Sequence, residues 1–285
     1  MRFLIQFSLL IGLFLSQSLF AASVWQVSKG EKTFYLAGTV HLLSESDFPL
    51  PKAYDTAFNA SSKLLFETDL GAMTQPQGMM QLMSQNTFAP GQSLQQVLSA
   101  EVYAKLKAEA DKRQWPLTSL EQFKPAFASM TMSVLELQRL GAAGTGVDMH
   151  YWQLGQQQNK TLAGLETLDE HLAVLNAMNQ LDANLVISST LNDLDKLEAM
   201  LGEMKAAWVK GDVAQLEVLF LKDLQQYPEL EAILLTERNH AWMKTLTALE
   251  ENNVMVLVGA LHLAGKDGLL KLLADQGYQL TQLTE

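Results

Sequence analysis

Residues 254–262, near the C-terminus, read Val-Met-Val-Leu-Val-Gly-Ala-Leu-His. The first five residues of this stretch are all apolar, which is typical of a β-strand buried on both faces. A glycine then ends the strand, and a histidine follows three positions later. Near the N-terminus, Tyr-Leu-Ala-Gly-Thr-Val-His at residues 35–41 repeats this order. Both ends of the chain are therefore predicted to supply a strand that leads into a Gly-x-x-His unit.

Further strands are predicted from short β-type or apolar runs bounded by turn residues. These runs are residues 24–27, 33–37, 63–67, 160–165 and 278–283. The first two flank a short polar loop that contains Gly30, so we expect them to form a hairpin. Residues 160–165 look like a buried strand that ends at Glu166.

Helix formers dominate the middle of the chain, with capping signals at several starts. Ser99 is placed to cap one helix, and Thr167 and Glu170 fit a capping box that starts another. The predicted helices are residues 54–60, 100–113, 126–140, 148–157, 185–224 with breaks near Gly202 and Gly211, 229–249 and 268–275. We therefore expect an α/β fold with a central mixed, largely parallel sheet built from both chain ends and a large helical insertion at about residues 75–250.

The composition excludes several classes of function. The formal net charge is -11, from 20 Lys and Arg against 31 Asp and Glu, and such an acidic chain repels nucleic-acid phosphates. No nucleic-acid partner is therefore expected. The chain has no Cys, which rules out disulfides, thiolate nucleophiles and Cys-ligated metal sites.

The N-terminus has the features of a secretory signal. Arg2 precedes an apolar run at residues 3–15, and small residues follow at Ala21 and Ala22. We predict a signal peptide over residues 1–21 and a domain over residues 22–285, in a periplasmic or secreted protein of a Gram-negative-type bacterium. The alternative is an uncleaved anchor, in which case the leader would be the only membrane contact.

Four predicted strands end in residues that can exchange protons or bind metal: His41, Glu67, Glu166 and His262. Ligands of parallel α/β sheets bind where loops leave the carboxyl ends of the strands. Two imidazoles with one or two carboxylates suit a divalent metal such as Mn, Co or Zn. Without a metal, one histidine could act as a general base that a glutamate orients. The residues by themselves leave both possibilities open.

Each candidate also has a structural interpretation. A single histidine near a strand end is more often structural, but two Gly-x-x-His units after apolar runs favour function. Glu166 could serve only the helix start beside it. Arg238, on a predicted helix, could stabilise an oxyanion or form a surface salt bridge. Gly38 and Gly259 would let the chain turn sharply and let a ligand approach the backbone.

The ordered set of motifs resembles the TraB/GumN family, which includes the animal Tiki proteins. The resemblance spans essentially the whole chain after the leader. Its elements are residues 35–41, 65–69, 146–148, 164–167, 238–239 with Trp242, and 258–263 with Gly265 and Gly268.

This resemblance implies an α/β fold related to erythromycin esterases and to a haem-binding iron-regulated protein. For the Tiki branch it implies metal-dependent proteolysis, with Mn or Co favoured. It further implies an active centre of His41, His262 and Glu67, with a functional role for Arg238.

The expected function is accordingly that of a periplasmic metal-dependent hydrolase acting on peptide bonds. His41 and His262 would bind the metal, with Glu67 as third ligand or general base. Arg238 and Asn239 would face the developing negative charge, while Glu166 and Asp148 would support the site. Two alternatives remain: a non-enzymatic binder of peptide or haem, and a metal-free, esterase-like hydrolase. In each case the expected partner is a peptide or a small molecule.

Overall fold

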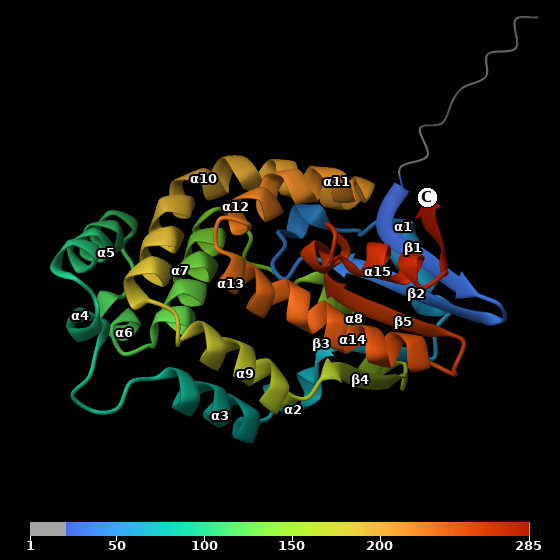
Figure 1. Ribbon diagram of the computed structural model, residues 1–285, viewed down its shortest axis with the longest axis horizontal. Coiled ribbons are helices and arrows are strands. Elements are labelled where there is room, and N and C mark those ends of the chain that lie inside the picture. The colour runs from blue at the N-terminus through green and yellow to red at the C-terminus, as the bar shows by residue number, and fades with distance from the viewer. Residues whose placement is uncertain (1–20, 285) are drawn as a thin grey trace, which may run out of the picture.

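The computed structural model describes residues 21–284, and a six-stranded sheet forms its centre (Figure 1). The order of the strands across the sheet is β4-β3-β5-β2-β1-β6. The strands are β1 (Ala21–Lys29), β2 (Lys32–Thr39), β3 (Lys63–Thr68), β4 (Thr161–Glu166), β5 (Val254–Gly259) and β6 (Gln279–Thr284).

The sheet is mixed and mostly parallel. Neighbouring strands from β4 to β2 run parallel, whereas β1 is antiparallel to both β2 and β6. The prediction of a mixed, largely parallel sheet built from both chain ends is thus confirmed. Strands β2 and β5 are direct neighbours, with Gly38 opposite Val258 and Thr39 opposite Gly259. The two Gly-x-x-His units therefore leave the sheet side by side.

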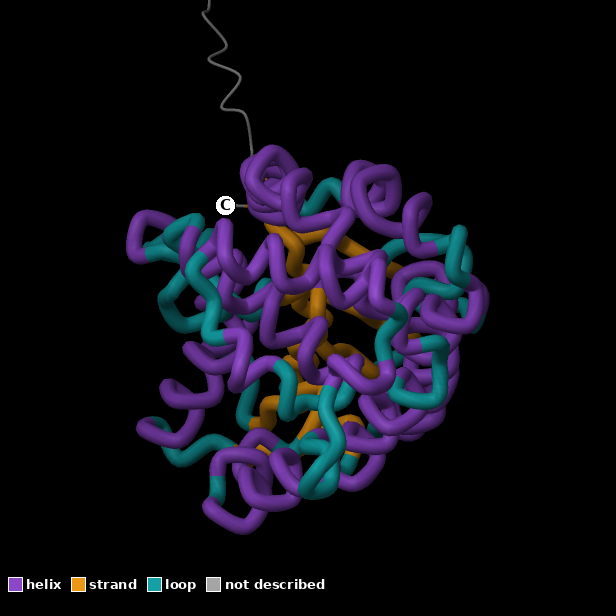
Figure 2. The backbone as a smooth tube through the Cα atoms, turned by 90° about the vertical axis from the view of Figure 1, so that its left-hand side faces the viewer, coloured by secondary structure: helices purple, strands orange, loops and turns teal. Residues whose placement is uncertain are grey.

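Helices surround the sheet, as the tube in Figure 2 shows. The helices are α1 (Lys52–Asn59), α2 (Leu70–Thr74), α3 (Pro76–Asn86), α4 (Leu94–Val97), α5 (Ala100–Arg113), α6 (Leu117–Leu120), α7 (Pro125–Arg139), α8 (Val147–Gln157), α9 (Leu168–Met178), α10 (Ala183–Lys210), α11 (Val213–Leu216), α12 (Lys222–Leu224), α13 (Pro228–Glu231), α14 (Glu237–Ala248) and α15 (Leu269–Asp275). Short 3₁₀-helices cover Glu45–Asp47 and Ala260–Leu263, and π-helical turns cover Glu217–Leu221 and Ala232–Thr236.

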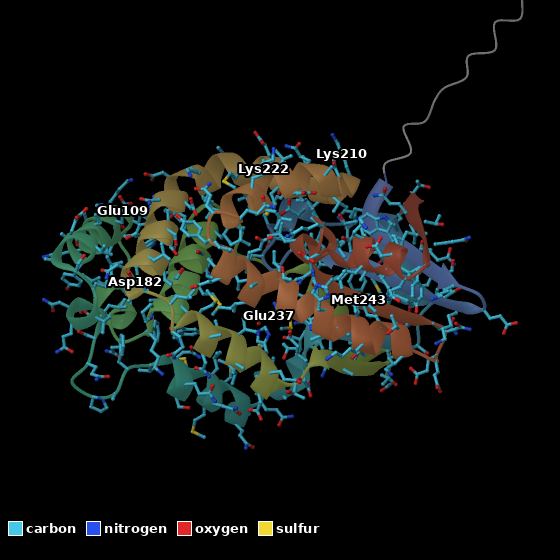
Figure 3. The ribbon with its side chains drawn as sticks, in the orientation of Figure 1. Glu109, Asp182, Lys210, Lys222, Glu237 and Met243 are labelled. Carbon is cyan, nitrogen blue, oxygen red and sulfur yellow. The ribbon has the colours of Figure 1, made fainter. Side chains whose placement is uncertain are left out.

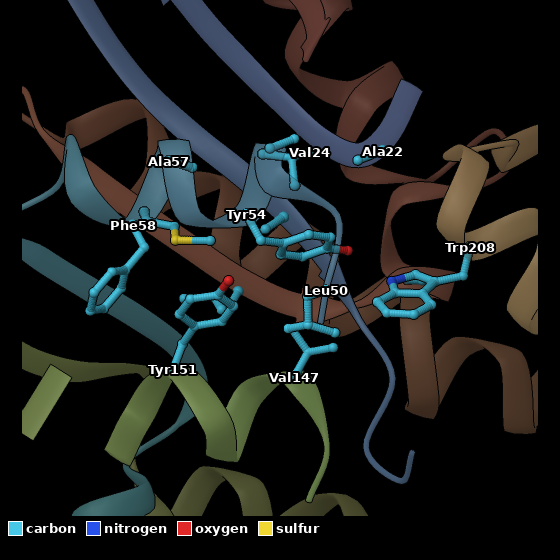
Figure 4. Packing of buried hydrophobic residues seen from close by; sticks show 14 of the residues in the cluster. Ala22, Val24, Leu50, Tyr54, Ala57, Phe58, Val147, Tyr151 and Trp208 are labelled. Carbon is cyan, nitrogen blue, oxygen red and sulfur yellow. The ribbon is translucent and has the colours of Figure 1, made fainter. Parts of the chain in front are cut away.

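Each face of the sheet carries its own apolar core because successive side chains of a strand point to opposite faces. On one face, Leu64 and Leu257 pack with Tyr54 of α1, Tyr151 of α8 and Trp208 of α10, part of which Figure 4 shows. The hydroxyl of Tyr54 and the indole N–H of Trp208 both donate to the carbonyl of Gly38, which anchors the end of β2.

The opposite face is covered by α14 and α15. Val256 and Val258 of the sheet pack there against Trp242 and Leu246 of α14 and Leu269 of α15. Since α14 also carries Arg238, this packing fixes the position of the guanidinium beside the strand ends.

A third apolar cluster joins α5, α7 and α10 in the helical half of the molecule, at the left in Figure 1. Charged side chains such as Glu109 of α5 and Lys222 of α12 lie on the outside of the molecule (Figure 3). Within residues 21–284, none of the helices combines the length and the apolar character that a membrane crossing requires.

The local predictions agree with the structure except at two places. Helix α10 continues through Gly202, where a break was expected, and ends at Gly211, which has a φ of 60°. Strand β4 lies at the border of the sheet and is only partly buried, because no described strand pairs with its outer edge. The predicted leader lies outside the described residues apart from Ala21, which begins β1.

Candidate functional site

The carboxyl ends of β2, β3, β4 and β5 bring His41, Glu67, Glu166 and His262 to one end of the sheet. Three of these residues, Glu67, Glu166 and His262, contact the same side chain, Arg238. The fourth, His41, lies beside the outer part of the group. Residues from both ends and from the middle of the chain thus form one site.

Arg238 is the centre of the group. Its Nε donates to Glu166 Oε1 at 2.7 Å, and its Nη2 donates to Glu67 Oε2 at 2.8 Å and to Glu166 Oε2 at 3.0 Å. The Arg238 side chain is 10% exposed, against 12% for Glu67 and 8% for Glu166. Such an arrangement compensates two buried carboxylates with a single cation.

The start of α14 and its packing hold this guanidinium in place. The π-helical turn Ala232–Thr236 comes directly before α14, and Arg238 Nη1 donates back to the carbonyl of Leu234 at 3.4 Å. The guanidinium carbon lies 4.7 Å from the ring centre of Trp242, a cation–π distance. Trp242 Nε1 in turn donates to Glu166 Oε1 at 3.0 Å.

His262 is buried, and Asn239 determines which of its ring nitrogens carries the proton. The amide nitrogen of Asn239 donates to the carbonyls of His262 at 3.2 Å and Asp267 at 2.8 Å. Its Oδ1 therefore accepts a hydrogen bond from His262 Nδ1 at 2.7 Å. Neutral His262 keeps its lone pair on Nε2, which lies 3.2 Å from Arg238 Nη1 and 3.8 Å from Glu67 Oε1.

This use of Asn239 differs from the predicted one. We expected its amide to face developing negative charge together with Arg238. Both amide donor contacts go to backbone carbonyls instead, and the side chain is buried. Asn239 is therefore a positioning residue for His262.

His41 occupies a different environment, because its side chain is 65% exposed. Its Nδ1 lies 3.2 Å from Oδ1 of Asp148, in the first turn of α8. The cap of that helix, Gly146, lies so close to the chain at His41 that a Cβ atom there would be 2.2 Å from the His41 carbonyl oxygen. The close approach places Asp148 beside the imidazole.

Gly259 shows that the two histidines share one space. A Cβ atom on this residue would lie 3.0 Å from Glu67 Oε1, 3.8 Å from His41 Nε2 and 3.7 Å from His262 Cδ2. The backbone N–H of Gly259 also donates to Glu67 Oε1 at 2.6 Å. The missing side chain thus leaves a small space that both imidazoles and a carboxylate oxygen border.

The surroundings in the site shift the pKa values of the two histidines in opposite directions. Burial lowers the pKa of His262 to about 4, so its imidazole is neutral at pH 7. The negative charge of Asp148 raises the pKa of His41 to about 9, which favours an imidazolium. Burial alone would raise the pKa of Glu67, but the facing histidines, Arg238 and the Gly259 N–H lower it well below its ordinary value. Burial would also raise the pKa of Glu166, but His171 and Arg238 lower it below its ordinary value.

The donor types at this site suit a divalent cation, but their spacing in this structure does not. Imidazole nitrogens and a carboxylate are ligands of Mn, Co and Zn. Within residues 21–284, however, no group of three His, Cys, Asp or Glu side chains is arranged to hold one metal ion. Arg238 Nη1 also approaches the lone pair of His262. We therefore derive no catalytic step through a metal.

The structure adds residues that the sequence reasoning did not place in the site. His171 Nδ1 lies 3.2 Å from Glu166 Oε2, and its place in α9 is one turn after the helix start. Thr39 and Thr68 are both 3% exposed, and their hydroxyls have no hydrogen-bond partner among the described residues. Thr39 pairs with Gly259 and Thr68 with Glu166 on neighbouring strands, so both residues lie at the end of the sheet that carries the site. Nothing in their local sequence distinguishes these threonines from ordinary strand residues.

Comparison with known proteins agrees with this arrangement of motifs. The protein of Escherichia coli (strain K12) named "Uncharacterized protein YbaP" is 25% identical over 247 residues, which cover 86% of this chain and 89% of that protein. The "Metalloprotease TIKI2" of Danio rerio is 22% identical over 300 residues, which cover 86% of this chain and 57% of that protein. The TIKI2 of Xenopus tropicalis is also 22% identical, over 94% of this chain and 61% of that protein. No solved structure matches.

The sequence model of the TraB/PrgY/gumN family matches residues 23–282, which include every strand end and helix of the site. Since the match extends over most of the chain, this protein belongs to the TraB/PrgY/gumN family.

Proposed function

We propose that the protein is a hydrolase that cleaves peptide bonds at the end of the sheet where His41, Glu67 and His262 border the space over Gly259. The observation that carries this proposal is the convergence of Glu67 Oε1 and His41 Nε2 on one point, at 3.0 and 3.8 Å, next to the buried Arg238. Carboxylate, imidazole and guanidinium are the groups that acid–base hydrolysis uses. The kinship with proteins named metalloproteases supports the same reaction class.

The protonation states assign a role to each group. Ionised Glu67 would accept a proton from a water molecule as the water oxygen attacks the substrate carbonyl. The His41 imidazolium would donate a proton to the leaving amine as the C–N bond breaks, and Asp148 would hold its ring. Arg238 would offset the negative charge that develops on the carbonyl oxygen. Opposite pKa shifts in one site are a common basis for assigning an acid and a base.

A second candidate is the same hydrolysis with a divalent metal, Mn or Co. It is favoured by the protonation states of Glu67 and His262. An ionised carboxylate and a neutral imidazole with a lone pair on Nε2 are the forms that bind a metal ion. The lowered pKa values also make both groups weak bases. In this candidate His41, His262 and Glu67 would hold the ion, and the ion would supply Lewis acidity. Binding would require Arg238 to leave His262 and His41 to lose its proton.

One set of assays tests both candidates. A library of ten-residue peptides is incubated with the protein after chelation and after addition of Mn, Co or Zn, and the products are identified by mass spectrometry. Cleavage that persists after chelation supports the acid–base route, and cleavage that needs Mn or Co supports the second. Glu67→Gln should abolish cleavage by either route without unfolding the chain. Absence of cleavage under every condition would contradict the proposed function.

Export to the periplasm is a separate proposal that rests on the N-terminal leader. After expression in a Gram-negative host, the protein should appear in the periplasmic fraction with its N-terminus at Ala22 or Ser23. That start would leave most of β1 in place, including Val24 opposite Ala37. A full-length N-terminus in the membrane fraction would instead support the anchor.

A further inference from the structure

A groove of about 600 Å³ runs beside the candidate site, between β4 and the start of α9 on one side and α2 and α3 on the other. Residues 162–166 of β4 line part of one wall, and Glu166 is the last residue of that strand. Because the Glu166 carboxylate binds Arg238 at 2.7 Å, the groove borders the group of residues assigned above to hydrolysis. It is therefore positioned to receive the part of a substrate that extends away from the reacting bond.

The wall formed by β4 is an open strand edge. β4 lies at the border of the sheet (Figure 1), where its described strand partner is β3. The N–H of Thr161 donates to the carbonyl of Ser62 at 3.0 Å, so the backbone groups of Thr161 point toward β3. Backbone groups alternate along a strand, which directs the N–H and C=O of Leu162 and Gly164 to the open side. Such an edge is a template for an added extended peptide.

The charge of the groove determines which peptide fits. Its lining includes Asp69, Glu166, Asp169 and Glu170, together with three glutamines, and it contains no Lys or Arg. Asp169 Oδ1 accepts from the neutral amide of Gln81 at 2.5 Å, and Asp69 Oδ1 accepts from the backbone N–H of Ala72 at 2.9 Å. Neither carboxylate forms an ion pair with the part of the chain that the structure describes, so both leave negative charge in the groove. A peptide with Lys or Arg side chains complements this surface.

We propose that the groove binds an extended, positively charged peptide segment as an additional strand on the edge of β4. The segment would hydrogen-bond to the outward backbone groups of β4, and its basic side chains would lie near Asp69 and Asp169. One end of the segment would then reach Glu166 and the space over Gly259. The role of this segment as substrate rests on the proposed hydrolase function, whereas its binding to the edge does not.

Binding is measured with the full-length Glu67→Gln variant, so that turnover does not consume the peptide. The probe is a fluorescent ten-residue peptide that alternates Val and Lys, compared with one that alternates Val and Glu. The lysine peptide should bind at least tenfold more tightly, with the difference falling as salt screens the charges. Asp169→Lys and Gln77→Lys, on opposite walls, should each weaken binding of the lysine peptide by about tenfold. Glu203→Lys is the matched control, because Glu203 is an exposed acidic residue on α10 outside the groove lining.

Strand addition is tested with two further lysine peptides that carry N-methyl groups on alternate residues, in opposite frames. A methyl group removes the N–H that would pair with β4 in one frame and lies on the far side in the other. One frame should lose binding at least tenfold, and the other should retain it. Equal binding of the two frames, or an Asp169→Lys effect no larger than that of Glu203→Lys, would overturn the proposal.

The outcomes separate this proposal from the proposed function. Frame-dependent binding without cleavage by the wild-type protein, with or without Mn or Co, would support the peptide groove and contradict the hydrolase. Cleavage of peptides that show no frame dependence would support the hydrolase and contradict the groove.

Discussion

The two Gly-x-x-His units leave neighbouring strands of one sheet, yet they place their histidines in opposite surroundings. His262 follows β5, is buried and donates from Nδ1 to Asn239 at 2.7 Å. His41 follows β2, is 65% exposed on its side chain and contacts Asp148 at 3.2 Å. Their glycines differ as well, since Gly259 borders the site and Gly38 packs against Leu263 and Ala260.

One sequence motif can therefore supply two chemically distinct groups. A neutral amide partner and burial keep His262 uncharged, whereas a carboxylate partner favours the charged form of His41. The distinction comes from α8 and α14, which lie on opposite faces of the sheet. A substitution at one histidine or its partners can therefore be controlled by the matching substitution at the other.

The largest effect on stability is expected from Arg238→Ala, next to the buried His262. Removal of the guanidinium leaves Glu67 and Glu166 buried without their cation, so the free energy of unfolding should fall by about 3–5 kcal/mol. Asp148→Ala, beside the exposed His41, should cost less than about 1 kcal/mol. Urea denaturation followed by circular dichroism measures both. Equal losses in the two variants would contradict the buried network.

A smaller effect is expected from the histidines themselves. His262→Ala removes packing against Trp242, whose ring centre lies 4.4 Å away, and leaves the Asn239 carbonyl without its donor. We expect a loss of about 2–4 kcal/mol in the free energy of unfolding. For His41→Ala the loss should stay below about 1 kcal/mol, because the side chain is exposed and solvent screens its attraction to Asp148. Both variants should lose hydrolysis. Of the two, only His41→Ala should lose it while the free energy of unfolding stays close to that of the wild-type protein.

The pH dependence should have opposite signs for the two histidines. The folded-state pKa of His262, about 4, is below the ordinary 6.5, so the unfolded chain binds a proton first as the pH falls. The free energy of unfolding should thus decrease by about 1–3 kcal/mol from pH 6.5 to pH 4, and less in His262→Gln. The contribution of His41, with a pKa of about 9, is complete below pH 6.5 and is lost as the pH rises through 9.

NMR titration of the imidazole signals measures the two pKa values directly. Asp148→Asn should lower the pKa of His41 toward its ordinary value and leave that of His262 unchanged. If both histidines titrated near pH 6.5 in the wild-type protein, the acid and base roles assigned to the site would lose their basis.

A modest stability effect is also expected from the two glycines. In Gly259→Ala the added carbon would lie 3.0 Å from Glu67 Oε1, and in Gly38→Ala it would lie 2.9 Å from a terminal methyl of Leu263. Each change should cost about 1 kcal/mol, because a nearby side chain has to shift. Hydrolysis should be lost in Gly259→Ala and largely retained in Gly38→Ala. A reversal of these activities would contradict the location of the reaction over Gly259.

Most elements of the fold are predictable because their signals are local. Ser99 caps α5, Thr167 and Glu170 form the expected capping box, and the apolar run at 254–258 forms β5. The break expected at Gly202 is absent, since a glycine in a long packed helix costs only about 1 kcal/mol and neighbouring contacts compensate. The burial expected for residues 160–165 was wrong because a strand's place in the sheet order depends on the whole chain.

Some features of the candidate site are predictable from the sequence, and others depend on how the helices pack. That His41, Glu67, Glu166 and His262 would meet follows from the sequence, because parallel strands bring their carboxyl ends to one side of a sheet. The use of Asn239 as the support of His262 and the approach of His171 to Glu166 do not follow from it. Both contacts depend on how α9 and α14 pack against the strands, which no local pattern records.

The sequence is sufficient to predict the strand-to-histidine units, the capped starts of α5 and α9 and the family, because each depends on residues close together or on an ordered set of motifs. The folded structure is needed to show that Arg238 binds Glu67 and Glu166 together, that one histidine is buried and the other exposed, and that β4 presents a free edge among the described strands. Charge state and accessibility arise from contacts between residues far apart in the chain, and those contacts exist only once the helices have packed onto the sheet.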